Sequence, residues 1–443
     1  MAKHSASAKS VVITALLVGM LAISSAAQSK ARIVRLSEIQ GAVQIDRNLG
    51  QGYERAFLNM PLTEGMRLWA KDDGRAEVEF EDGSVVRLVP NSRLDFSRLS
   101  LSASGEKRNT LRLGEGTAYV NFKGQRNDEF ILEFARERIA LDRSAHFRVD
   151  MNDAQANLAV FQGDVNVEGP AGRVELGKKQ SANFDLADND QYTVAKNFEE
   201  DQYDAWDKQQ DQYHQRGLSN SYTSSYPYSY GASDLNYYGN FMNVPGYGNM
   251  WQPYLTGAGW NPYQDGGWSY YPGAGYTWVS AYPWGWMPYR YGSWVFVPQY
   301  GWLWQPGGWN GWVTGPRVVN PPRRFVSPQP PVRGHATVAV GTGPAYPPVV
   351  PPNRIVVSNG QAGLGVPRGA VKDLGKVAGK VAASGPVEIK VPHASSGFGD
   401  AGNRSTGPVV SHPSGWRGGQ SQSHPTSAPT PHASTPSHGP PHR

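Results

Sequence analysis

Apolar and polar residues alternate in short runs between residues 32 and 195. Residues 76–80 (AEVEF) and 118–122 (AYVNF) carry apolar side chains at every second position, the spacing of a β-strand with one buried face. Turn sequences rich in Gly and Asp, such as Gln162-Gly163-Asp164, separate these runs. About eleven such strands predict a mainly β fold, an antiparallel β-sandwich or roll.

Residues 197–216 are the best helix candidate in the chain. A period of 100° per residue places aromatic side chains on one helix face and carboxylates on the other. These are Phe198, Trp206 and Tyr213 on the first face, and Asp201, Asp204, Asp207 and Asp211 on the second. We expect a connector helix whose rings pack onto a neighbouring segment. Its acidic face is expected to be solvated rather than to bind a cation.

An aromatic repeat occupies residues 231–312, and eleven of the fourteen tryptophans lie between 251 and 312. Three units share the pattern aromatic-x3-Pro-x5-Trp. They are Phe241/Pro245/Trp251, Trp268/Pro272/Trp278 and Trp294/Pro298/Trp304. Each unit predicts a β-hairpin with proline at its turn, and three stacked hairpins can bury a strip of indoles.

Two interpretations of these rings stay open. Exposed indole and phenol rings stack on sugars or grip peptides. The same rings could instead form the core of a small module that has few aliphatic residues. The candidate ligand-binding rings are Trp268, Trp278, Trp286, Tyr289, Trp294, Trp302 and Trp304. Arg290 lies among them and could stack on one ring.

Positive charge is concentrated in residues 316–443. This stretch has a net charge of +10, whereas residues 28–200 and 201–315 carry −4 and −3. It is rich in Pro, Gly and His, so we expect a disordered basic arm that contacts an anionic surface. Its histidine spacing lacks the pattern of a closed metal site. Because the segments that look foldable are acidic, no nucleic-acid partner is expected.

The first 27 residues have the organisation of a secretory signal peptide. Lys3 and Lys9 precede an apolar run, residues 11–23, and small residues then lead to a cleavage site between Ala27 and Gln28. The alternative is an uncleaved membrane anchor, which needs about 20 apolar residues. We therefore expect an exported protein of the periplasm, the cell envelope or the exterior, without a transmembrane span after cleavage.

Two turn motifs in the β-domain carry a family resemblance. Asp82-Gly83-Ser84 leads through a short strand into Pro90-Asn91-Ser92, and Gly114-Glu115-Gly116 and residues 146–149 and 160–165 follow in order. In this order and spacing, residues 32–195 resemble the FecR periplasmic domain. The resemblance implies a β-domain and an envelope location. A signal peptide stands where FecR regulators carry a cytoplasmic anti-sigma segment and a membrane helix, so signalling to a sigma factor is not implied.

Candidate chemistry in the β-domain is sparse. Asp72, Asp73 and Asp82 are explained by turn geometry, and His146 by an ordinary position at a strand edge. Glu77 and Glu79 share one face of a strand, which we expect to be the solvent face. The chain has no cysteine, which excludes a disulfide scaffold, cysteine-ligated zinc and thiol catalysis. We predict no catalytic residue, no cofactor and no metal site.

The sequence favours a non-enzymatic exported bacterial protein. In this interpretation a FecR-like scaffold or binding module engages cell-wall glycan or partner proteins through its aromatic repeat and basic tail. The alternative is an envelope sensor whose FecR-like domain binds a membrane receptor. An enzyme is the least supported class, because no nucleophile–base pair, phosphate-binding loop or metal motif is present in the sequence.

Overall fold

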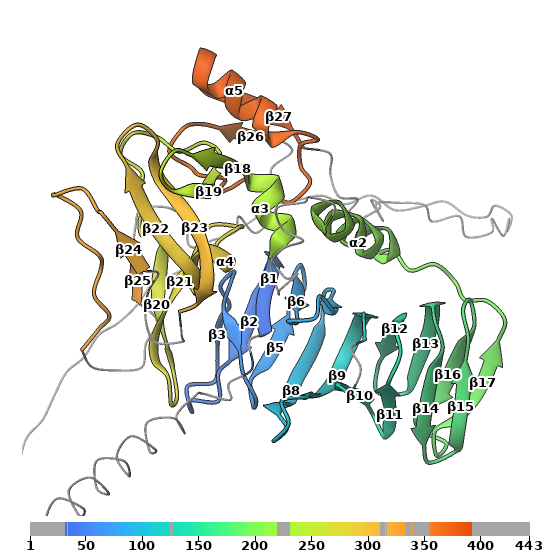
Figure 1. The fold of residues 1–443 in the computed structure, drawn as a ribbon. Helices are drawn as coiled ribbons and strands as arrows, with labels where there is room; N and C mark the ends of the chain where they lie inside the picture. Colours follow the sequence, from blue (N-terminus) through green and yellow to red (C-terminus); the bar gives the residue numbers. More distant parts are fainter. Residues whose placement is uncertain are drawn as a thin grey trace, which may run out of the picture. The chain divides into compact units, whose positions relative to one another are not determined.

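Residues 34–195 fold into a domain built from strands, which confirms the predicted mainly β fold (Figure 1). The computed structural model of the chain describes residue 32 and residues 34–124, 127–218, 231–310, 315, 317–332, 338–340 and 354–391. The expected signal peptide and its cleavage site at Ala27 and Gln28 lie outside these residues.

The strands of this domain form two sheets that share β9. In chain order they are β1 (Val34–Gln40), β2 (Val43–Asp46), β3 (Tyr53–Arg55), β4 (Pro61–Leu62), β5 (Arg67–Ala70), β6 (Arg75–Glu79), β7 (Val85–Leu88), β8 (Ser92–Leu101), β9 (Lys107–Phe122), β10 (Glu129–Phe134), β11 (Glu137–Leu141), β12 (Ala145–Met151), β13 (Gln155–Gln162), β14 (Val165–Gly169), β15 (Gly172–Leu176), β16 (Ser181–Asp185) and β17 (Gln191–Ala195). Sheet A has the order β4–β1–β6–β7–β9–β12–β13–β16–β17. Sheet B has the order β3–β2–β5–β8–β9–β10–β11–β14–β15.

Strand β9 passes from one sheet to the other near Gly116. Residues 107–115 pair with β8 of sheet B, and residues 116–122 pair with β12 of sheet A. Gly116 has φ +78, and a Cβ there would lie 2.3 Å from the Asn91 carbonyl oxygen. Only glycine fits this crossing, because any side chain would collide with the backbone of the preceding turn.

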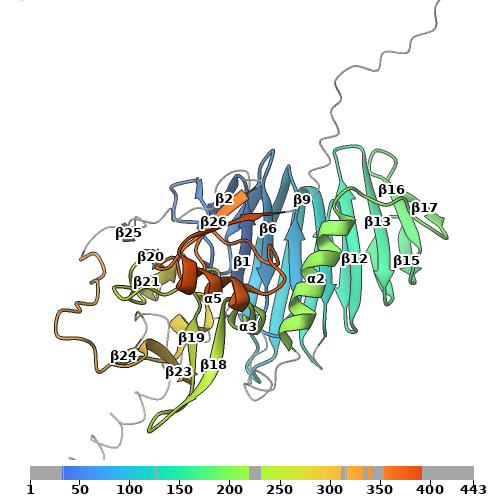
Figure 2. The same ribbon diagram turned by 90° about the horizontal axis from the view of Figure 1, so that it is seen from above.

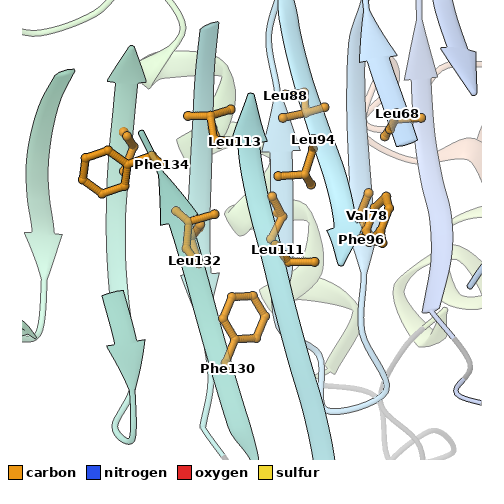
Figure 3. Packing of buried hydrophobic residues seen from close by; sticks show 14 of the residues in the cluster. Leu68, Val78, Leu88, Leu94, Phe96, Leu111, Leu113, Phe130, Leu132 and Phe134 are labelled. Carbon is orange, nitrogen blue, oxygen red and sulfur yellow. The ribbon is translucent and has the colours of Figure 1, made fainter. Parts of the chain in front are cut away.

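The inward-facing side chains of both sheets form one apolar core. On β10, Phe130, Leu132 and Phe134 point inward and alternate with Glu129, Ile131 and Glu133. Figure 3 shows these three side chains beside leucines of the neighbouring strands. The period-two pattern therefore predicted correctly which residues of such strands face the core.

Three hairpins follow, each at a repeat unit. They are β18 (Gly239–Val244) with β19 (Gly248–Pro253), β20 (Gly266–Tyr271) with β21 (Gly275–Ser280), and β22 (Tyr291–Val297) with β23 (Gly301–Trp309). The first and last residues of each repeat pattern lie directly opposite one another across the strands. These pairs are Phe241 with Trp251, Trp268 with Trp278, and Trp294 with Trp304. The predicted hairpins are confirmed.

Helices join these parts. α2 (Asp204–Leu218) lies on the outer face of sheet A (Figure 2). α3 (Ala232–Tyr238) follows it, and α4 (Met287–Arg290) precedes β22. The connector helix was expected over 197–216 and begins seven residues later. The residues before it form turns in which the Asp204 carboxylate accepts from the Asp201 N–H at 3.0 Å.

The C-terminal stretch contains regular structure where we expected disorder. It holds β24 (Arg317–Val319), β25 (Val338–Val340), β26 (Arg354–Val357), α5 (Leu374–Ser384) and β27 (Val387–Lys390). Val357, Leu374 and Val381 are buried against the aromatic cluster of the hairpins. The expectation of a disordered arm from residue 316 onward is therefore wrong for residues 354–391, where scattered aliphatic side chains find a ready apolar surface. Residues 392–443 lie outside the described part.

Candidate functional site

The first turn motif secures one end of the sheet-A part of β9. The Asp82 carboxylate accepts hydrogen bonds from the Ser84 N–H at 2.9 Å and from the Ser84 hydroxyl at 3.0 Å. Gly83 supplies the positive φ of the turn, +81. The Ser84 hydroxyl oxygen accepts from the Lys123 N–H at 2.9 Å, just beyond the last residue of β9.

The second motif secures the other end. Asn91, after Pro90, takes the left-handed backbone conformation with φ +61. The following Ser92 is fully buried, and its hydroxyl oxygen accepts from the Thr117 N–H at 2.8 Å. Both motifs thus hold β9 in place through serine oxygens. Their residues have a structural role in this geometry.

The outer face of sheet A carries charged side chains that are buried. Arg35, Glu77, Glu79 and Arg87 are at most 2% exposed. The expectation that Glu77 and Glu79 face solvent is wrong. The alternation places them opposite the core, as predicted, but this second face is covered by α2, α3 and a C-terminal segment.

Helix α2 turns its carboxylates toward this face. Arg87 Nη1 lies 2.5 Å from Asp207 Oδ1, and Arg87 Nη2 lies 2.8 Å from Asp211 Oδ1. One turn earlier, Asp204 accepts from the Tyr119 hydroxyl at 2.8 Å and pairs with Arg148 at 2.6 Å. The expected solvated acidic face is therefore wrong. It is the face by which the helix binds the sheet.

A second group of ion pairs joins the aromatic module and the C-terminal segment to the same face. Arg35 Nη2 lies 2.5 Å from Glu79 Oε2 and 2.7 Å from Asp234 Oδ2 of α3. Arg368 Nη1 lies 2.8 Å from Glu77 Oε1, and its Nε lies 3.1 Å from Asp234 Oδ1. We call the set Arg35, Glu77, Glu79, Arg87, Asp207, Asp211, His214, Asp234 and Arg368 the ionic junction.

The charges in the ionic junction hold one another ionised. Burial alone would raise the pKa of Glu77, but His214, Arg87 and Arg368 hold it well below its ordinary value. Burial would likewise raise the pKa of Asp234, which Arg368 and Arg35 lower instead. Burial alone would lower the pKa of the His214 imidazole, but the Glu77 carboxylate at 2.9 Å raises it above its ordinary value.

His146 lies beside this junction, near the start of its strand. Its strand, β12, pairs with β9 on one side and β13 on the other. His146 Nε2 lies 2.8 Å from Asp207 Oδ2, and potential ligand atoms of His146, Asp207 and Asp211 all fall within 4.8 Å of one another. Arg87 already pairs with both carboxylates, so a cation there would meet a guanidinium at contact distance.

The seven candidate ligand-binding rings are all buried. The exposed fraction is 0% for Trp278, Trp294 and Trp304, and no more than 5% for Trp268, Trp286, Tyr289 and Trp302. Two of them bond to backbone inside the module: Trp304 Nε1 donates to the Tyr291 carbonyl at 2.7 Å, and the Tyr289 hydroxyl donates to the Pro262 carbonyl. Ligand binding by these rings stays untested, but as placed they offer no face to a sugar. Their burial is what the core interpretation predicts.

Arg290 is part of the same interior. Its guanidinium carbon lies 5.3 Å from the centre of the Trp286 ring, and Nη2 donates to the Trp278 carbonyl at 2.9 Å. The expected stacking of this arginine on an indole is confirmed. The aromatic rings open to solvent lie elsewhere, for example Tyr300 at the turn of the third hairpin, which is 41% exposed.

Sequence reasoning missed the arginines of the ionic junction together with Asp234 and His214, and it placed the other carboxylates of the junction on solvent faces. Arg35, Arg87, Asp234 and Arg368 have no motif around them, and their partners are distant in sequence.

Within the ranges that the structure describes, no helix is both long enough and apolar enough to cross a membrane.

Comparisons with known proteins match two segments of the chain. The family model described as "FecR protein" matches residues 66–166 of the β-domain, in agreement with the resemblance drawn from the turn motifs. A second model, "Family of unknown function (DUF6600)", matches residues 232–323, which contain the hairpin module. No curated protein matches the chain.

Solved structures give a more distant likeness. One, described as the "Crystal structure of a putative anti-sigma factor from Parabacteroides distasonis", is 17% identical with a TM-score of 0.27, and the match covers 32% of this chain. A second structure of the same description is 16% identical with a TM-score of 0.26 and a coverage of 30%. The chain spans 63% and 59% of the length of these two proteins.

Proposed function

We propose that this chain, whose residues 66–166 match the FecR model, is a non-enzymatic binding scaffold of the bacterial cell envelope. The observation that carries the proposal is the ionic junction. It fastens the FecR sheet, helix α2, the aromatic module and residues 354–391 to one another through buried charges. Such a joint holds several modules in a fixed arrangement, which suits a scaffold.

The partners we propose are cell-wall glycan or another envelope protein. The buried rings stabilise the hairpins from within and cannot contact a glycan. Contacts with a glycan would therefore be made by rings at the hairpin turns. Tyr247 and Tyr300 occupy the same position in two repeat units, each directly before the glycine that ends the turn. A phenol at such a tip can stack on a sugar face.

Retention of the full chain on purified cell-wall sacculi tests this proposal. We expect the wild type to be retained and the double substitution Tyr247→Ala/Tyr300→Ala to weaken retention at least several-fold. Tyr192→Ala is the matched control, since this tyrosine lies on β17, the last strand of the β-domain, and not on a hairpin. Equal retention of all three proteins would contradict the glycan contact, and no retention of the wild type would contradict the glycan as partner.

The FecR match favours a second candidate, an envelope sensor that binds a membrane partner. In a sensor, the domain that matches the FecR model would pair with the receptor. Cross-linking in intact envelopes followed by purification distinguishes the two. One membrane protein recovered in a fixed ratio supports the sensor, whereas recovery of glycan alone supports the scaffold.

A further inference from the structure

Strand β17 is an edge of sheet A that lacks the usual protection. Figure 1 shows it as the last strand of the sheet, and among the described strands it pairs with β16 alone. Its five residues, Gln191–Ala195, carry no charge and no proline, and they include Tyr, Thr and Val, which favour strands. Such an edge presents N–H and C=O groups that can pair with another strand.

The other three edges of sheets A and B are each blunted. β4 has two residues, and one of them is Pro61. β3 has three residues, of which Glu54 and Arg55 are charged. β15 is as long as β17 but carries the exposed charges of Arg173 and Glu175. Short length, proline and charge are the devices by which sheets avoid edge pairing, so β17 is the exception among the four.

The apolar core is open beside this strand. Val194 lies on the core side of β17, opposite the buried Ala182, yet its exposed fraction is 49%. Tyr192, on the same side, reaches across to sheet B, where its hydroxyl donates to the Arg173 carbonyl at 3.4 Å. A further strand beside β17 would cover Val194 and remove its apolar surface from water.

The two ends of β17 carry opposite charge. At the start of the strand, the residues that lead from β16 are acidic, with the exposed carboxylates of Asp185 and Asp188. At its end, the exposed side chains are basic: Lys178, Lys179 and Lys196. The first two lysines reach this end because their turn leads directly into β16, whose first residue lies opposite the last residue of β17.

The neighbouring charges leave this polarity in place. Asp190 is buried and adds no net charge to the acidic end, because Arg136 pairs with it at 2.8 Å. Asp164, in the turn between β13 and β14, lies near the basic end, which keeps a net charge of +2 against −2 at the other end. The connector after β17 turns away from the edge, since the Glu199 carbonyl accepts from Arg148 of β12 at 3.3 Å.

We propose that β17 pairs with β17 of a second copy of this chain, antiparallel and about a two-fold axis, so that sheet A continues from one copy into the other. This arrangement brings the acidic end of each strand to the basic end of the other, whereas a parallel pair would bring like charges together. An axis through Thr193 pairs all five residues of each strand. The pairing uses main-chain groups, so it does not depend on the Tyr192 side chain. The proposal adds an assembly state to the proposed scaffold and is independent of its ligand.

Sedimentation velocity of the full chain over a range of concentrations tests the pairing. A five-residue edge makes a small interface, so we expect the wild type to pass from monomer to dimer as its concentration rises through the micromolar range. Val194→Lys places a charge at the edge and should weaken dimerisation at least ten-fold. Val356→Lys, at an exposed position of β26, is the matched control and should dimerise as the wild type does.

Three results of this experiment would overturn the proposal. They are a wild type that stays monomeric up to millimolar concentration, a Val194→Lys variant that dimerises like the wild type, and an equal loss of dimer in both variants.

Charge reversal tests the antiparallel arrangement. Asp188→Lys and Lys196→Asp should each weaken dimerisation several-fold, because each removes the attraction at both ends of the strand pair. Both substitutions in one chain should restore dimerisation, since each acidic end then meets a basic end again. A double variant as weak as the single variants would overturn the two-fold arrangement.

A single thiol tests the register. The chain has no cysteine, so Thr193→Cys introduces the only one. In the proposed register the two copies of residue 193 are direct cross-strand neighbours, with Cβ atoms about 4.5–5.5 Å apart. Mild oxidation or a short thiol-specific cross-linker should join two chains at least ten-fold faster than in Val356→Cys, which places the thiol on β26. Equal rates in the two variants would overturn the pairing of β17 with itself.

Discussion

At the scale of single residues, two serine hydroxyls explain the two turn motifs of the β-domain. Ser92 is fully buried, and its oxygen satisfies the Thr117 N–H where β9 crosses between the sheets. We expect Ser92→Ala to lower the free energy of unfolding by about 1–3 kcal/mol, because a buried N–H loses its acceptor. Chemical unfolding of the full chain measures the change. Ser97→Ala, at an exposed position of β8, should change the free energy of unfolding by less than about 0.5 kcal/mol. An equal loss in both variants would contradict the role of the Ser92 hydroxyl in holding β9.

A second residue-scale prediction concerns Glu137, which faces Asp190. Their exposed fractions are 3% and 0%, and Arg136 Nε lies 2.8 Å from Asp190. Burial, and then the charge of Asp190, raise the pKa of Glu137 to about 7. The folded chain therefore binds a proton that the unfolded chain releases, and this contribution to stability is lost as the pH rises through about 7.

Glu137→Gln copies the protonated form at every pH. We expect the variant to melt at a higher temperature than the wild type in alkaline buffer, and at the same temperature in acid buffer below the ordinary pKa of glutamate. Thermal unfolding across this range measures the difference. A difference in melting temperature that is the same at every pH would show that the pKa of Glu137 is not raised in the folded chain.

At the scale of elements, the hairpins could be predicted from the sequence and the orientation of α2 could not. In the repeat, an aromatic residue and the tryptophan ten positions later are cross-strand neighbours, so the pairing is local, as for Trp294 and Trp304. The partners of α2 are remote, since Arg87 is 120 residues from Asp207 and Arg148 is 56 residues from Asp204. A row of carboxylates indicates a solvent face unless distant arginines are known to meet it.

The contacts of α2 predict the effect of removing Arg87. Arg87→Met would remove the shared cation of the buried Glu77 and Asp207 and of the partly buried Asp211. We expect a loss of about 3–5 kcal/mol in the free energy of unfolding, together with faster proteolysis of residues 197–218. Arg173→Met is the control, since its pair with Glu168 is 3.7 Å long and more than half exposed. That change should shift stability by less than about 1 kcal/mol, and similar effects of the two substitutions would contradict the docking role.

At the scale of the whole chain, the modules are joined by residues whose importance no local pattern shows. Arg368 lies in a stretch of Pro, Gly and Val that we expected to be disordered, yet it is buried between Glu77 and Asp234. Composition averaged over residues 316–443 concealed one short structured segment. The β-domain and the hairpins could be predicted because their patterns repeat, whereas the ionic junction combines residues of β1, β6, β7, α2 and α3 with Arg368.

We expect the ionic junction to make the arrangement of the modules depend on pH. His214 is the group that loses its proton as the pH rises. Its imidazole faces Glu77 at 2.9 Å and Glu79 at 3.9 Å, with Arg368 nearby, and Lys123 and Asp211 line the small cavity beside it. The pKa of His214 is higher in the folded chain than its ordinary value of 6.5. Its contribution to stability is therefore full below that value and is lost as the pH rises through the raised pKa.

The buried carboxylates set the acid limit of the same joint. The pKa values of Glu77, Asp207 and Asp234 are lowered in the folded chain, so their contribution is present above the ordinary carboxylate range and is lost on acidification. The contribution of Glu38 to stability has the opposite dependence on pH, because burial raises its pKa. We expect His214→Gln to be less stable than the wild type in mildly acid buffer and to approach it as the pH rises past the raised pKa of His214. Melting temperatures of both proteins over this range measure the effect, and curves that stay parallel would show that His214 carries no charge in the junction.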